Sequence, residues 1–296
     1  MRNHTLPKGA ITALVTPFNE DGSVNFAKME EMIEDQISKG IDGLLILGTT
    51  GESPTLSHHE DDEVVECALA KVSGRVPVIV GSGSNSTQTM LHKSLKYEEM
   101  GADALLLISP YYNKANEQGM IRHFTTVADQ VHIPCILYNI PGRTGCNISV
   151  SAMEELSKHP NIKGVKEASG NLSYAMDLAH LLNDDFVMYS GNDDIIVPMM
   201  AAGASGVISV LSNIAPAETH EMTQAFLDGD LEKARAMQIA YLPVIHALFS
   251  EVNPIPVKKA LNLQGRAVGG YRLPLYEMDE KKAEHLAKVM DEAGLL

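Results

Sequence analysis

The feature that most constrains this chain is a regular alternation, sustained through residue 210, of short apolar runs and longer amphipathic segments. The runs are rich in Val, Ile and Leu, and each ends near Gly, Thr, Ser, Pro or Asn. Such runs are typical of strands that are buried on both faces of a parallel sheet. The predicted strands are Ala10–Val15, Gly43–Leu47, Val76–Val80, Ala104–Ile108, Cys135–Tyr138, Ile162–Lys166, Phe186–Tyr189 and Gly206–Val210.

Between the apolar runs lie segments with the periodicity of amphipathic helices. The first opens after Asn25, a residue type that caps helices, and ends at Gly40, a residue type that terminates them. Another begins at Ser57 with Glu60 three residues later, which is the spacing of a capping box. The predicted helices are Phe26–Lys39, Ser57–Ser73, Thr87–Met100, Glu117–Gln130, Ser149–Lys158, Leu172–Leu182 and Ile195–Ala202.

Eight strands, each followed by a helix, predict an α/β fold, a closed (β/α)8 barrel of the TIM type. An open doubly wound sheet is the alternative, but the only glycine pattern resembling a nucleotide loop, Gly81-Ser-Gly83, lacks the third glycine and the acidic partner. After Val210 only helical patterns follow, so we expect a catalytic barrel over residues 1–220 and a rigidly packed C-terminal helical domain over 221–296. These later helices are predicted at Ala217–Asp228, Leu231–Ser250, Val257–Leu263 and Glu280–Glu292.

Composition excludes several classes of protein. With 38 Asp and Glu against 23 Lys and Arg, the net charge is −15, which disfavours non-specific binding to nucleic acid or to anionic lipid. No apolar run approaches the roughly 20 residues of a membrane-spanning helix, and no signal peptide is recognisable. Cys67, Cys135 and Cys146 are too few for a disulfide framework. We therefore expect a cytoplasmic protein with neither nucleic-acid nor membrane partners.

In a barrel of this kind, the active site lies at the C-terminal ends of the strands, and Lys166 ends one of them. Because side chains alternate along a strand, Ile162, Gly164 and Lys166 share one face and Val165 lies on the other. Val165 suits packing against helices, so Lys166 is predicted to point into the barrel, with Gly164 leaving room for its stem. An ammonium in an apolar barrel loses hydration, which lowers its pKa and makes the neutral amine available for Schiff-base formation.

Two glycines flank the two hydroxyls in the segment Gly48–Glu52, after the second strand. Such a turn lets backbone N–H groups and the Thr49 and Thr50 hydroxyls converge on an anion the size of a carboxylate. The alternative is an ordinary turn that leads into a helix. We expect Glu52 to bond the loop backbone rather than to take part in catalysis.

Further polar groups end the fourth and fifth strands. Tyr138 shares a face with Ile136, one strand away from Lys166, where its phenol could relay protons; alternatively it is a core tyrosine bonded to backbone. Arg143 follows in a Pro/Gly loop, and its planar guanidinium could bind a carboxylate through two hydrogen bonds. Adjacent Tyr111 and Tyr112 are typical of rim packing or of an interface.

The sequence predicts neither a metal site nor a cofactor. The 11 histidines are scattered without the spacing of metal ligands, and no Ser-His-Asp or Cys-His signature stands out. An amine, a phenol and a carboxylate cradle together indicate carbonyl chemistry on a keto acid through an imine.

Six motifs, spread from residue 48 to residue 261, make the chain similar to the dihydrodipicolinate synthase family of the pyruvate-dependent aldolase superfamily. This resemblance implies a lyase that condenses pyruvate with L-aspartate 4-semialdehyde on the route to diaminopimelate and lysine. The motifs are GTTGES (48–53), SPYYN (109–113), YNIPGRTG (138–145), KEASGN (166–171), SGND (190–193) and NPIPVKKAL (253–261).

The resemblance also implies a catalytic set. Lys166 matches the Schiff-base lysine, and Tyr138 matches the tyrosine that relays protons beside it. Thr49 links that tyrosine to Tyr112, whose counterpart in the family reaches in from a neighbouring subunit. The implied assembly is a homotetramer built as a dimer of dimers.

For the substrates, Thr50 matches a contact to the pyruvate carboxylate. Arg143 matches the arginine that holds the carboxylate of the semialdehyde; its presence within PGRTG favours the synthase over N-acetylneuraminate lyases. Gly191 and Ile208 match residues that line the site.

For regulation, His58, Asn85 and Tyr111 match parts of the lysine site of inhibited family members. Three other positions carry Pro54, Asp61 and Thr89, where inhibited enteric-type enzymes tend to have a small residue, a histidine and a glutamate. Because a glutamate that could pair with the effector's ammonium is missing, we expect weak or absent inhibition by lysine.

Two alternatives stay open. Another pyruvate-dependent aldolase, acting on 2-keto-3-deoxygluconate or N-acetylneuraminate, would keep Lys166, Tyr138 and the GTTGE turn. A non-catalytic barrel protein would form no imine with pyruvate.

Overall fold

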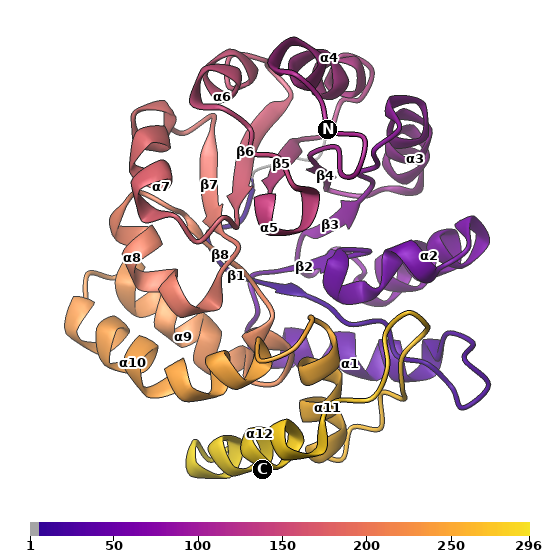
Figure 1. Cartoon of the computed structure of the whole chain (residues 1–296), viewed down its shortest axis with the longest axis vertical. Helices are drawn as coiled ribbons and strands as arrows, with labels where there is room; N and C mark the ends of the chain where they lie inside the picture. The colour runs from indigo at the N-terminus through magenta and orange to yellow at the C-terminus, as the bar shows by residue number, and fades with distance from the viewer. Residues whose placement is uncertain (1–5) are drawn as a thin grey trace. The chain divides into compact units, whose positions relative to one another are not determined.

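The computed structural model describes residues 6–296, and its eight strands form one closed, parallel barrel in chain order (Figure 1). The predicted (β/α)8 barrel is therefore confirmed. The strands are β1 (Gly9–Ala13), β2 (Gly43–Ile46), β3 (Val78–Gly81), β4 (Ala104–Ile108), β5 (Cys135–Asn139), β6 (Ile162–Glu167), β7 (Val187–Ser190) and β8 (Gly206–Ser209).

Helices follow the strands, and four further helices come after β8, as the periodicity predicted. They are α1 (Phe26–Ser38), α2 (His58–Val72), α3 (Thr87–Met100), α4 (Glu117–Ala128), α5 (Pro141–Thr144), α6 (Val150–Leu156), α7 (Leu172–Leu178), α8 (Ile196–Ala201), α9 (Pro216–Leu227), α10 (Leu231–Leu248), α11 (Ile255–Leu263) and α12 (Glu280–Glu292). Short 3-10 turns are η1 (Thr49–Gly51), η2 (Ser53–Thr55), η3 (Ala179–Leu181), η4 (Asp193–Ile195) and η5 (Leu211–Asn213).

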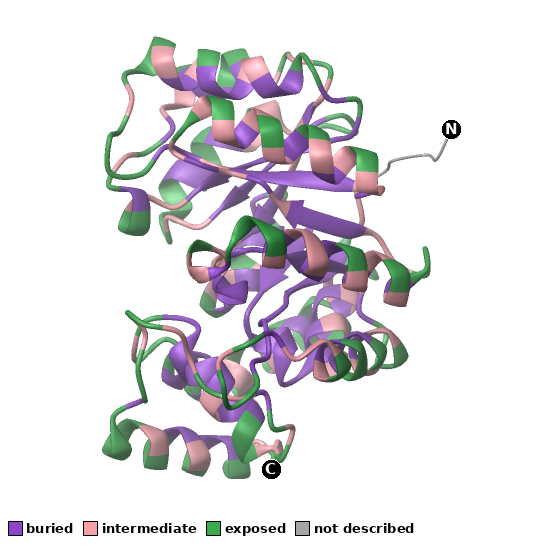
Figure 2. Cartoon of the chain, turned by 90° about the vertical axis from the view of Figure 1, so that its right-hand side faces the viewer, coloured by how far each residue is buried: buried purple, intermediate pink, exposed green. Residues whose placement is uncertain are grey.

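The strands are buried almost throughout, whereas most helices have one buried and one exposed side (Figure 2). Their apolar residues on both faces account for this burial. Local signals also begin the helices as expected: Asn25 caps α1 by accepting a hydrogen bond from the Lys28 N–H, and Ser57 and Glu60 form both bonds of a capping box at the start of α2. None of the helices in the described part of the chain combines the length and hydropathy needed to cross a bilayer.

The chain forms two compact units. The central unit comprises residues 77–208 together with the described residues 6–8, and the terminal unit comprises Gly9–Val76 and Ser209–Leu296. In the terminal unit, α9 packs against β1, and α10 packs against α9, α11 and α12. The expected boundary at residue 220 stays a prediction.

Within the central unit, β5 and β6 set the register of the candidate site. Tyr138 lies opposite Lys166 and Asn139 lies opposite Glu167. An irregularity between Cys135 and Ile136 shifts the register at the start of the pair. It precedes both Tyr138 and Lys166, which lie opposite each other beyond it.

Candidate active site

Lys166 is buried near the C-terminal end of β6, with 6% of its surface exposed. Its ammonium nitrogen lies 4.5 Å from the centre of the Tyr138 ring on the neighbouring strand. A cation over the face of an aromatic ring is attracted by the ring's quadrupole. Tyr138, which the sequence placed one strand away from Lys166, therefore lies directly beside its amine.

A glycine makes room for the lysine stem, but it is not the one we expected. At Gly191, a Cβ atom would lie 3.1 Å from Lys166 Cε and 2.4 Å from Ala168 Cβ. At Gly164, a Cβ atom would instead lie 2.6 Å from the Val187 carbonyl oxygen on β7. The predicted reason for Gly164 was therefore wrong: this glycine accommodates the neighbouring strand, and Gly191 accommodates the lysine.

Burial lowers the pKa of Lys166 to about 8. The negative charge of Asp193 acts in the opposite direction and raises this pKa, while the positive charge of Arg143 lowers it further. At pH 7, a lysine with this pKa is neutral in about a tenth of the molecules, far more often than an exposed lysine. The site therefore supplies a nucleophilic amine near neutral pH.

The rate of adduct formation with pyruvate should consequently rise with pH and level off above a midpoint near 8, rather than near the ordinary 10.5. The rate rises with pH because only the neutral amine attacks a carbonyl. The measurement is the borohydride-trapped adduct, followed by mass spectrometry at a series of pH values. Asp193→Asn, which removes the charge that raises the pKa, should move the midpoint downward; a midpoint near 10.5 in the unmodified protein would contradict the assignment.

The residues next to Tyr138 and Lys166 tie the two strands together. Asn139 donates from Nδ2 to Glu167 Oε2 at 2.7 Å, and the Ser169 N–H donates to Glu167 Oε1 at 2.6 Å. Glu167 is 2% exposed, and burial raises the pKa of its carboxyl group. This network fixes β5 against β6 directly beside the lysine and the phenol.

Beyond β5, the loop that we expected around Arg143 contains the short helix α5. Pro141 begins it, since proline suits the first turn of a helix. Arg143 is exposed on α5 and is near enough for its charge to influence Lys166. On β8, Ile208 is buried at 1% exposure.

The paired tyrosines after β4 differ sharply in exposure. Tyr112 is 92% exposed and has a φ of 68°, whereas Tyr111 is 38% exposed. The Asn85 side-chain amide donates to the Tyr111 carbonyl oxygen at 3.2 Å, so two of the three predicted regulatory residues are neighbours. His58, the third, belongs to the terminal unit, where it begins α2.

Thr49 and Thr50 also belong to the terminal unit, so their placement against Lys166 stays part of a proposal. Both lie in the 3-10 turn η1, and Thr50 is 3% exposed. The Thr16 hydroxyl donates to the Gly51 carbonyl oxygen at 2.6 Å. As expected of a structural carboxylate, buried Glu52 accepts a hydrogen bond from a backbone N–H, that of Arg272, at 3.2 Å.

Sequence reasoning missed three buried polar residues: Asp193 in the central unit, and Asn253 and Lys258 in the terminal unit. Each lies in a motif that we had quoted for its resemblance without assigning it a role. Only Lys258 had a visible signal, as a charged residue directly after the apolar run 254–257. Among residues 6–296, no three His, Cys, Asp or Glu side chains gather in a way that could hold a metal ion.

The fold and the site together define a class. A closed β/α barrel that holds a buried lysine of lowered pKa beside a tyrosine has the parts of an enzyme that forms a Schiff base with a carbonyl compound.

The chain belongs to the dihydrodipicolinate synthetase family, whose model matches residues 6–293. It is 50% identical over 290 residues to the 4-hydroxy-tetrahydrodipicolinate synthase of Thermoanaerobacter sp. (strain X514), covering 98% of this chain and 97% of that protein. It is also 50% identical over 289 residues to the 4-hydroxy-tetrahydrodipicolinate synthase of Lachnoclostridium phytofermentans, covering 97% and 98% respectively. The resemblance seen in the motifs is thus confirmed over nearly the whole chain, and the chain is accordingly a lyase of this family.

Solved structures of dihydrodipicolinate synthases are similar to this chain over nearly its whole length. The dihydrodipicolinate synthase of Aquifex aeolicus is 41% identical, with a TM-score of 0.95 over 97% of this chain and 98% of that one. A monomeric dihydrodipicolinate synthase variant is 38% identical, with a TM-score of 0.96 over 99% of each chain.

Proposed function

We propose that this chain acts as a 4-hydroxy-tetrahydrodipicolinate synthase, condensing pyruvate with L-aspartate 4-semialdehyde through an imine on Lys166. The observation that carries the proposal is the buried Lys166 amine, with a pKa of about 8, held against Tyr138 at the C-terminal end of a barrel strand. The family membership supports the same chemistry.

In the proposed reaction, the neutral Lys166 amine attacks the pyruvate ketone, and loss of water gives a cationic imine. The positive charge acidifies the pyruvate methyl group, and loss of a methyl proton gives an enamine. The enamine carbon attacks the aldehyde carbon of the semialdehyde, forming the new carbon–carbon bond. The amino group of the resulting adduct then displaces Lys166 as the ring closes, which restores the free enzyme.

Protons for these steps pass through Tyr138, Thr49 and Tyr112 in the proposed relay. Tyr138 is in place beside the Lys166 amine. The 92% exposure of Tyr112 supports a role in which it reaches into a second subunit. The proposed assembly is therefore a homotetramer, a dimer of dimers in which each site takes one tyrosine from its neighbour.

The substrates are held by their carboxylates in this proposal. The Thr50 hydroxyl and the N–H groups of its turn bind pyruvate, while Gly191 and Ile208 line the space beside Lys166. Arg143, exposed on α5, offers its guanidinium to the semialdehyde carboxylate. His58, Asn85 and Tyr111 stay candidates for an effector site. No cofactor, nucleic acid or membrane enters the proposal, and a cytoplasmic location stays a prediction.

Arg143→Ala should raise the KM for the semialdehyde about 10- to 100-fold, since a charged hydrogen bond to the carboxylate is lost. The KM for pyruvate should change little. Steady-state kinetics with each substrate varied in turn measure both constants, and Arg122→Ala on α4 serves as a matched loss of charge. Equal increases for the two substrates would contradict the assigned role.

The proposed activity is tested by comparing substrates. Condensation of pyruvate with L-aspartate 4-semialdehyde should greatly exceed cleavage of 2-keto-3-deoxygluconate or N-acetylneuraminate. Faster cleavage of either sugar acid would assign the chain to another pyruvate-dependent aldolase. Absence of any pyruvate adduct would show that the chain is a barrel protein that does not catalyse this chemistry.

A further inference from the structure

The Thr50 hydroxyl contacts a side chain from the far end of the sequence. Asn253 precedes α11 and donates from Nδ2 to Thr50 Oγ1 at 2.9 Å. Both residues are buried, with Thr50 3% and Asn253 8% exposed. Neither sequence reasoning nor the proposed mechanism gives Asn253 a role.

This hydrogen bond determines what the Thr50 hydroxyl can do. A hydroxyl carries one proton and two acceptor lone pairs. The Asn253 amide already supplies a proton to the oxygen, so the hydroxyl's own proton points elsewhere and can be donated to another acceptor. A carboxylate accepts hydrogen bonds only, and it therefore matches a hydroxyl that is oriented as a donor.

The turn that carries Thr50 is held independently of Asn253. The Lys258 ammonium pairs with Glu52 Oε1 at 2.8 Å, and the side chains of both residues are fully buried. Breaking such a buried pair leaves an uncompensated charge, so the pair fixes the turn firmly. The Thr16 hydroxyl bond to the Gly51 carbonyl oxygen adds a second anchor.

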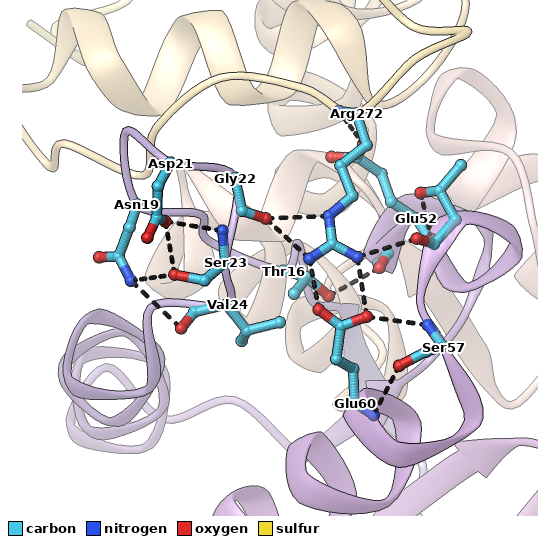
Figure 3. Close-up of polar contacts among 12 residues, drawn as sticks. Thr16, Asn19, Asp21, Gly22, Ser23, Val24, Glu52, Ser57, Glu60 and Arg272 are labelled. Carbon is cyan, nitrogen blue, oxygen red and sulfur yellow. Dashed lines mark hydrogen bonds and ion pairs between the residues drawn. The ribbon is translucent and has the colours of Figure 1, made fainter.

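A third anchor comes from Arg272, whose backbone N–H donates to Glu52 (Figure 3). Its guanidinium donates to the carbonyl oxygens of Gly22 and Thr55 and pairs with Glu60. These bonds join the β1–α1 loop, the Glu52 turn and the start of α2. The turn that carries Thr50 is therefore held by contacts that do not involve Asn253, and the bond from Asn253 acts on the Thr50 hydroxyl itself.

We infer that Asn253 is a positioning residue for the carboxylate of the keto-acid substrate, acting through Thr50 by keeping its hydroxyl oriented as a donor. This inference rests on the proposed function, in which Thr50 binds the pyruvate carboxylate. Asn253 is not assigned a contact with the substrate.

The test reverses the direction of the hydrogen bond between residues 253 and 50 while keeping the shape of the side chain at position 253. In Asn253→Asp the new carboxylate can only accept hydrogen bonds, so the Thr50 hydroxyl donates to it and no longer to the substrate. The KM for pyruvate should rise about 10- to 100-fold, the loss expected for a hydrogen bond to a charged group. The kcat at saturating pyruvate should stay within about threefold, because Lys166 and Tyr138 are untouched.

Asn262→Asp is the matched control, since it places the same charge on α11. Asn262 donates to the Gly269 carbonyl oxygen and accepts from the Val268 N–H, and it is exposed. This control should leave the KM for pyruvate within about twofold, as expected for a surface change remote from the bound group. Thermal unfolding of each variant verifies that it is folded.

A double-mutant cycle with Thr50→Ala separates positioning from plain repulsion or loss of structure. If Asn253 acts through Thr50, Asn253→Asp should have little further effect on the KM for pyruvate once Thr50 is alanine. An undiminished effect in the Thr50→Ala background would overturn the inference, as would an unchanged KM in the single variant. If the aspartate variant does not fold, Asn253→Ala replaces it in the same cycle, with a smaller rise in KM expected.

The inference and the proposed function fail in different ways. If the unmodified protein forms no adduct with pyruvate, the proposed function is wrong. If the unmodified protein forms the adduct but the cycle shows no coupling between Asn253 and Thr50, only the inference about Asn253 is wrong.

Discussion

Lys166→Ala should abolish the adduct that borohydride traps from pyruvate, and with it all measurable condensation. The reaction passes through an imine formed by the Lys166 amine, and this intermediate cannot form when the amine is removed. Among residues 6–296, the other buried lysine is Lys258, whose amine is held in an ion pair with Glu52 at 2.8 Å. The readouts are the intact mass of the protein after reduction and the rate of product formation.

Lys163→Ala is the matched control for this variant. Lys163 lies on the same strand but pairs with Asp185 at 3.0 Å, and a third of its side chain is exposed. We expect the control to form the adduct as the unmodified protein does. An adduct in Lys166→Ala, or its loss in Lys163→Ala, would show that the reactive amine has been misassigned.

Tyr138→Phe should lower kcat by about 10²- to 10⁴-fold, the usual contribution of a positioned proton-transfer group. The phenylalanine ring preserves the face that lies 4.5 Å from the Lys166 nitrogen, so folding and the lysine position should be retained. Single-turnover kinetics should show the slowing in the chemical steps, with the trapped adduct still forming at a lower rate.

Tyr174→Phe provides a comparison that separates catalysis from structure. The Tyr174 hydroxyl donates to the Ile148 carbonyl oxygen at 2.5 Å, and Tyr174 has no place in the proposed proton relay. Its loss should lower Tm while leaving kcat within about threefold, because one buried hydrogen bond contributes only about 1 kcal/mol. If Tyr138→Phe changed only Tm, as expected for Tyr174→Phe, the proposed proton relay would be contradicted.

The barrel could be predicted because each of its strands carries its own signal. A strand buried on both faces needs an apolar run, and eight such runs separated by helical periodicity leave few other arrangements. The ends of strands were less certain. The predicted third strand begins at Val76, whereas β3 begins at Val78. The difference arises at Pro77, which has no N–H to donate to a neighbouring strand.

The inward direction of Lys166 and Tyr138 could also be predicted, because side chains alternate along a strand and both residues lie near the C-terminal ends of neighbouring strands. The reason given for Gly164 failed, since the contact that matters there comes from Val187 on the next strand. Likewise, Asn253 and Thr50 lie 203 residues apart, and Lys258 and Glu52 lie 206 apart. No local pattern links such residues, so these bonds emerge only from the folded chain.

The most direct test of the central claim is a crystal structure of the protein soaked with pyruvate. We expect continuous electron density from Lys166 Nζ to the former ketone carbon, with the adduct's carboxylate at the Thr50 turn. Density that ends at an unmodified Lys166 side chain, with pyruvate absent or bound elsewhere, would contradict it.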